Sequence, residues 1–165
     1  MRMQFTLLLY IALCWSFALV AKSRVDNKDT ISHIDNGGFS IQRCSDSLYI
    51  LHLGESQWKL PFPVYRFCTG DVDGNGSIDA IVGVIKSTRY DKELRRRVFI
   101  FKNYHGMIRP LWLGSQLGQP VIDFTFLQDK KWLKVIERGC DGIPFTAYYR
   151  WRGFGMEYVS EEHTP

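Results

Sequence analysis

Strand-length apolar runs recur every 8–12 residues through most of this chain, and glycine-containing or polar turns separate them. Runs this short favour strands over helices. The runs that we expect to form strands are 39–44, 48–53, 57–60, 64–68, 79–85, 97–101, 107–113, 120–126, 131–137, 145–151 and 156–160. The pattern predicts an all-β domain of antiparallel meander sheets, in which residues 91–96 form the one short helix.

Two of these runs differ from the others because they are apolar at almost every position. They are AIVGVI (80–85) and VFIF (98–101). A strand with apolar side chains on both faces is typical of a sheet that is covered on both sides. Some of the other runs alternate clearly, so that Tyr149 and Trp151 fall on one face while Arg150 falls on the other. We therefore expect 80–85 and 98–101 to be central strands.

The N-terminus has the pattern of an export signal. Arg2 precedes an uncharged run (5–20), and the small residue Ala21 ends it. We expect residues 1–21 to be a signal peptide, with an uncleaved N-terminal anchor and lipidation of Cys14 as the alternatives that would attach the chain to a membrane. The remaining segments are a polar tether (22–36), a β-domain (37–160) and a tail (161–165). This organisation predicts an exported protein of the periplasm or cell envelope.

Charge and cysteine content narrow the functional classes. The net charge is +4, and it becomes +3 when Arg2 leaves with the signal, with 20 basic and 17 acidic residues remaining. Basic residues are scattered except at 95–97, whereas a nucleic-acid-binding protein usually carries a clustered basic face.

Cys44, Cys68 and Cys140 form no C-x-x-C pair. We expect all three to be buried hydrophobic residues, with a Cys44–Cys68 disulfide as an alternative outside the cytoplasm.

The sequence GDVDGNGSIDAIVGVI (70–85) places three aspartates directly before the most apolar strand. The oxygen ligands that we expect are the side chains of Asp71, Asp73, Asn75 and Asp79 and the backbone carbonyl of Ser77. Counted from Asp71, the four side chains occupy positions 1, 3, 5 and 9 of the loop, and the Ser77 carbonyl is at position 7. Gly76 at position 6 permits a sharp turn. Three crowded carboxylates repel one another by about 4 kcal/mol per pair at 4 Å and an effective dielectric near 20. The pattern predicts a bound Ca²⁺, and a plain turn that binds nothing is the alternative.

Other loops with similar composition fit less well. An EF-hand requires a glutamate at position 12, where this chain has Val82, and a helix on each side. The P-loop pattern G-x-x-x-x-G-K-[ST] does not occur. The dinucleotide pattern fails because its third glycine position holds Asp79.

The nine-residue pattern D-x-D-x-N-G-x-x-D between two strands resembles the FG-GAP and VCBS-type calcium loops of integrin-α-like β-propellers. The matching positions are Asp71, Asp73, Asn75, Ser77 and Asp79. A broader resemblance, carried by 67–91, RRVFIF, RPLWLGSQL and YRWRGFGMEY, is to small exported bacterial proteins of Bacteroidetes without an assigned activity. These resemblances imply a calcium-binding envelope protein and no enzyme. Because one loop and about 144 mature residues are too few for seven blades, the expected fold is a β-propeller-like fragment, with a small barrel or a sandwich as alternatives.

The functional expectation is a non-enzymatic β-domain that binds an envelope protein or glycan. The candidates for partner contact are Trp112, Arg150, Trp151 and Arg152. The alternative is a small hydrolase acting on envelope polysaccharide, which would need two facing carboxylates. The available ones are Asp123, Glu137, Asp141 and Glu157, and nothing in the sequence pairs them. A third possibility is a purely structural subunit of an envelope assembly.

Overall fold

A computed structural model describes residues 38–89, 91–114 and 116–162 of the 165-residue chain. The strands are β1 (Phe39–Ser45), β2 (Leu48–Leu53), β3 (Ser56–Leu60), β4 (Val64–Gly70), β5 (Asp79–Lys86), β6 (Arg95–Tyr104), β7 (Met107–Leu113), β8 (Val121–Leu127), β9 (Trp132–Arg138), β10 (Pro144–Trp151) and β11 (Met156–Glu162). Each overlaps one of the runs expected from the sequence, and no strand end differs from the expected one by more than three residues. The prediction of an all-β fold is confirmed.

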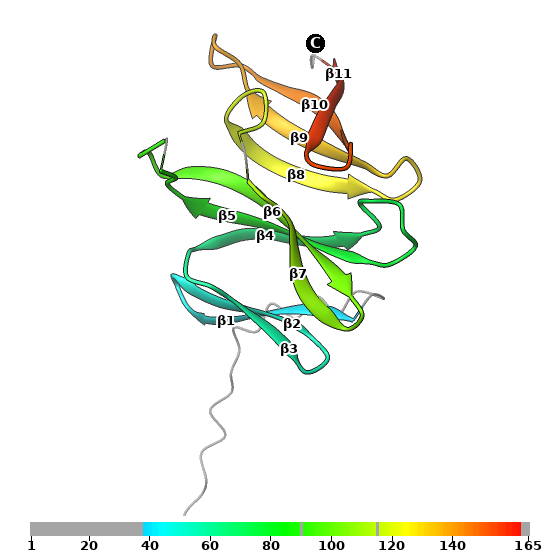
Figure 1. Ribbon diagram of the computed structural model, residues 1–165. Helices are drawn as coiled ribbons and strands as arrows, with labels where there is room; N and C mark the ends of the chain where they lie inside the picture. Colours follow the sequence, from blue (N-terminus) through cyan, green and yellow to red (C-terminus); the bar gives the residue numbers. More distant parts are fainter. Residues whose placement is uncertain (1–37, 90, 115, 163–165) are drawn as a thin grey trace, which may run out of the picture.

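The strands form three antiparallel sheets that follow one another along the chain. Their orders are β1-β2-β3, β4-β5-β6-β7 and β11-β10-β9-β8, so every strand pairs with its sequence neighbour. Figure 1 shows them stacked, with the green sheet β4–β7 between the cyan and the yellow-to-red ones. The meander topology is confirmed, and a propeller-like fragment or a sandwich is compatible with it. None of the sheets in the described residues closes into a barrel, so that alternative is wrong.

Two hydrophobic cores lie on the two sides of the middle sheet. Phe101 and Val82 pack toward the first sheet, together with Leu51 and Phe39. Ile81 and Ile100 pack toward the third sheet, against residues such as Val135. Neighbouring residues of β5 and β6 therefore enter opposite cores, which is why residues 80–85 and 98–101 are apolar at every position. The prediction of central strands at 80–85 and 98–101 is confirmed.

Three predictions about smaller features were wrong or have no structural counterpart. Residues 91–94 are irregular and Arg95 already belongs to β6, so there is no helix at 91–96; ion pairs from Arg95 and Arg97 to Asp91 hold the segment instead. Among the described residues, Cys44, Cys68 and Cys140 form no disulfide, so the Cys44–Cys68 bridge is not made. Cys44 and Cys140 are exposed rather than buried, because they lie at a strand end and in a turn.

The N-terminal predictions fall outside the described residues. The signal peptide or anchor (1–21), Cys14, and the tether (22–36) all belong to this part of the chain. At the other end, β11 continues to Glu162, two residues past the predicted end of the domain, and 163–165 are not described. In the described part of the chain, no helix has the length and apolarity that crossing a membrane requires.

Candidate metal centre

The acidic loop, residues 71–78 together with Asp79, connects β4 to β5 at one end of the middle sheet. Gly74 and Gly76 have φ angles of 78° and 85°, in the left-handed region that residues with a Cβ rarely adopt. Two such turns within three residues fold the loop back on itself. The next residues enter the buried strand β5, which fixes the end of the loop that carries Asp79.

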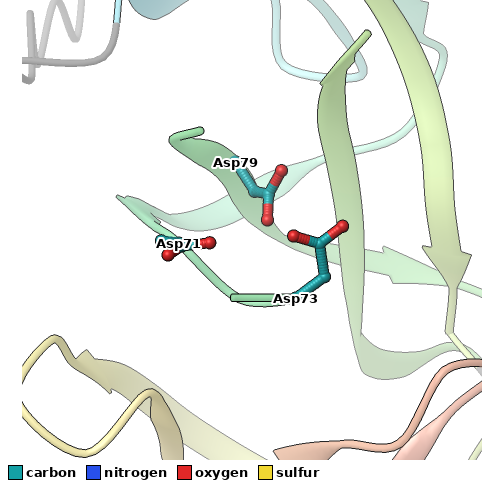
Figure 2. A group of neighbouring side chains, drawn as sticks. All are labelled: Asp71, Asp73 and Asp79. Atoms are coloured by element: carbon teal, nitrogen blue, oxygen red, sulfur yellow. The ribbon is translucent and has the colours of Figure 1, made fainter. Parts of the chain in front are cut away.

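Three carboxylates converge inside this loop. One oxygen from each of Asp71, Asp73 and Asp79 lies within 4.8 Å of the others. Figure 2 shows Asp73 and Asp79 pointing toward each other, with Asp71 beside them on the same loop. Asp79 is completely buried, whereas Asp71 and Asp73 are half-buried. The cluster therefore combines a rigid, desolvated carboxylate with two that face solvent in part.

Hydrogen bonds hold one oxygen of each of two carboxylates and leave the other oxygen without a partner. Asp79 Oδ2 accepts the backbone N–H of Val72 at 3.0 Å. Asp71 Oδ2 accepts the N–H of Gly76 at 3.2 Å and the ammonium of Lys131 at 2.7 Å. Asp71 Oδ1 and Asp79 Oδ1 are buried and accept no hydrogen bond. Buried oxygens of this kind cost free energy unless a cation or a donor satisfies them.

The electrostatics of the cluster follow from these contacts. Burial, with the charge of Asp73 added, raises the pKa of Asp79 to about 7. Burial also acts to raise the pKa of Asp71, but the hydrogen bonds from Lys131 and Gly76 outweigh it, and the net result is a lowered pKa. Without a cation, Asp79 therefore tends to keep its proton, whereas Asp71 stays ionised. A divalent cation would favour the ionised form of both.

Asn75 and Ser77 shape the loop in this structure. The side-chain oxygen of Asn75 accepts the backbone N–H of Ser77 at 2.7 Å. Its amide nitrogen donates to Asp73 Oδ2 at 3.0 Å. Asn75 thus orients Asp73, and its own oxygen is directed at the backbone. Of the five predicted ligands, the structure brings together the three aspartates.

Lys131 is part of this site although nothing in the sequence points to it. It ends the tight turn 128–131 between β8 and β9, and its φ angle of 54° is left-handed. The turn lies against the end of β4, where Gln128 Nε2 donates to the backbone oxygen of Thr69 at 2.7 Å. Figure 1 shows this turn and the β4–β5 loop on the same side of the molecule. Lys131 reaches Asp71 because the third sheet packs on the second.

The candidates for partner contact divide into buried and exposed residues. Trp112 belongs to the second core with 8% of its surface exposed. Trp151 packs in part against the same core. Arg150 and Arg152 are exposed, and both pair with Glu157. A hollow beside the acidic loop is lined by Asp73 and by residues 151–157, which run from the end of β10 through the turn to the start of β11.

The carboxylates considered for hydrolysis each have a local protein partner. Asp123 forms an ion pair with Arg66, and Asp141 accepts the backbone N–H of Ile143 at 2.9 Å. Glu137 is buried beside a hollow of about 670 Å³ that Asp141 also lines. Its two oxygens accept the Tyr149 hydroxyl at 2.8 Å and the N–H of Gln119 at 3.2 Å, and burial raises its pKa.

Comparison with protein-family models, with curated proteins and with solved structures returns no match to this chain.

Proposed function

We propose that the acidic loop is a structural Ca²⁺ site in an exported, non-enzymatic β-domain, which binds a protein or glycan partner at the cell envelope. The observation that carries the metal site is the pair of buried carboxylate oxygens, Asp71 Oδ1 and Asp79 Oδ1, that accept no hydrogen bond and belong to side chains clustered with Asp73. Ca²⁺ prefers carboxylate and carbonyl oxygens and tolerates irregular coordination. The bound ion would tie the β4–β5 connection together.

Asp71, Asp73 and Asp79 would hold the ion, and the FG-GAP-like pattern adds Asn75 and the Ser77 carbonyl as further ligands. The Asn75 oxygen accepts the N–H of Ser77 at 2.7 Å in this structure, and an amide oxygen has a second lone pair that a cation can bind. The charge of the ion would offset the mutual repulsion of the carboxylates and the burial of Asp79. The role that follows is stabilisation of the loop rather than catalysis.

Calcium should raise the melting temperature of the purified domain. Extracellular modules bind Ca²⁺ with Kd values of about 10⁻⁴–10⁻³ M. At 10 mM Ca²⁺ this corresponds to roughly 1.4–2.7 kcal/mol of stabilisation, or about 5–10 °C for a domain of this size. Differential scanning calorimetry with Ca²⁺ and with chelator measures the shift, and NaCl at matched ionic strength is the control. An equal melting temperature in all three conditions, with no heat of Ca²⁺ uptake at millimolar concentrations, would contradict the proposed metal site.

The partner-binding face that we propose surrounds the turn between β10 and β11. Phe154 is 92% exposed at the tip of this turn, beside the hollow that contains Asp73 and Arg152. Exposed aromatic rings next to arginine are enriched in protein interfaces relative to the rest of the surface. The hollow also adjoins the acidic loop, so a bound ion would stabilise one of its walls.

Phe154→Ser should weaken partner capture by the mature domain by at least tenfold, because aromatic anchors contribute strongly to interfaces. Leu94→Ser is the matched control, since Leu94 is also a highly exposed apolar residue, at 74%, but lies in the segment before β6. The measurement is quantitative recovery of envelope proteins and glycans on the immobilised domain. Equal recovery by both variants would place the binding face elsewhere. Turnover of envelope polysaccharide that disappears in Glu137→Gln would instead favour the hydrolase.

A further inference from the structure

Lys131 gives the acidic loop a defined charge. The carboxylates of Asp71, Asp73 and Asp79 contribute three negative charges when all are ionised, as metal ligands are. The ammonium of Lys131, 2.7 Å from Asp71 Oδ2, contributes one positive charge. Arg152, across the neighbouring hollow, shares Glu157 with Arg150, at 3.4 and 2.6 Å, and among the described residues it forms no ion pair with the three aspartates that would enter this sum. The sum over the three aspartates and Lys131 is minus two, which is the charge that a divalent cation neutralises.

The position of this ammonium is set by the fold. The tight turn that ends at Lys131 is held to β4 by the hydrogen bond from Gln128 to Thr69. Next to it, Phe126 packs so closely on Gly70 that a Cβ at that position would meet the ring at 2.1 Å. The ammonium also lies over Gly74, 3.6 Å from where a Cβ would stand. The anchored turn therefore fixes the position of Lys131 next to the acidic loop.

The contact also leaves the second oxygen of Asp71 without a partner. Lys131 and Gly76 both donate to Asp71 Oδ2, so the buried Oδ1 of the same carboxylate has no partner. A cation can be bound by Oδ1 while Lys131 stays on Oδ2. Outer contacts of this kind orient metal ligands in known sites.

From these contacts we propose that Lys131 is a specificity-determining residue, which matches the acidic loop to divalent rather than trivalent cations. The inference rests on the proposed metal site. The repulsion between the ammonium and a bound ion increases with the charge of the ion, so it disfavours a trivalent ion more than a divalent ion of similar size. Any loss of Asp71 orientation on removing Lys131 weakens the trivalent ion at least as much as the divalent one, so it cannot by itself produce a preference for Tb³⁺.

The test compares Ca²⁺ with Tb³⁺, which has a similar radius and the same preference for oxygen ligands. Calorimetric titration of the folded, metal-free domain gives both Kd values for the wild type, Lys131→Met, Lys131→Arg and Lys130→Met. Lys130 is the matched control because its ammonium lies over the Trp132 ring, 5.3 Å from the centroid, rather than on Asp71. We expect Lys131→Met to increase the preference for Tb³⁺ over Ca²⁺ by about tenfold. Lys131→Arg, which keeps the charge, and Lys130→Met should keep the wild-type ratio.

The outcomes separate the two proposals. If the wild type binds both ions and Lys131→Met leaves their affinity ratio unchanged, the role of Lys131 is overturned while the metal site stands. A shift of the same size in Lys130→Met would also overturn it, because the effect would then reflect general surface charge. If the wild type takes up neither ion, the metal site itself is wrong.

Discussion

Gly70→Ala should lower the free energy of unfolding by about 3 kcal/mol, because the new methyl group has no space. A Cβ at Gly70 would lie 2.1 and 2.3 Å from two ring carbons of Phe126, and 2.8 Å from Gln128 Nε2. Phe126 is itself buried in the second core, so its ring cannot move away without disturbing its neighbours. Urea denaturation of the two proteins measures the difference.

Gly155→Ala is the matched control for this substitution. No atom lies within 4 Å of a Cβ at Gly155, and its backbone is outside the left-handed region. We expect a change within about 0.5 kcal/mol. A small effect of Gly70→Ala as well would show that the third sheet packs less closely on the end of β4 than described. Lys131 would then have no fixed position over the acidic loop.

Asp79→Asn should have opposite effects with and without calcium. In calcium-free buffer at pH 8, the variant should be more stable than the wild type by about 1–3 kcal/mol, since it removes a buried charge that burial and Asp73 disfavour. The asparagine oxygen can still accept the N–H of Val72. With millimolar Ca²⁺ the variant should show no rise in melting temperature, because a central ligand is lost. Asp46→Asn, at an exposed position in the turn between β1 and β2, should change neither result.

The same variant isolates the pH dependence that comes from Asp79. Its pKa is raised from 3.8 to about 7 by burial, so the folded state keeps a proton that the unfolded chain releases. The calcium-free wild type should therefore lose stability relative to Asp79→Asn as the pH rises from about 4 to about 7, and the difference should level off above that. A shift of this size corresponds to a change on the order of 4 kcal/mol. Parallel stability–pH curves for the two proteins would contradict the burial of an ionisable Asp79.

Most of the fold could be predicted because its signals are local. Each strand is an apolar or alternating run of ordinary length, and each turn is marked by glycine or polar residues, so strand existence and order followed directly. The two-sided burial of β5 and β6 was also visible, since only a strand covered on both faces is apolar throughout. The helix predicted at 91–96 was wrong. The charged composition of this segment is compatible with a helix, but it does not reveal the ion pairs to Asp91 that stabilise an irregular conformation.

The acidic loop itself was determined by the sequence, because its aspartates and glycines are neighbours in the chain and backbone geometry alone brings them together. The tertiary structure decided the rest: that Asp79 is fully buried, that Asp71 and Asp79 each have an oxygen without a partner, and that Trp112 lies inside a core. It also placed Lys131 on a loop that ends 52 residues earlier in the chain. That contact depends on the packing of one sheet against another, and side chains brought together in this way leave no pattern in the local sequence.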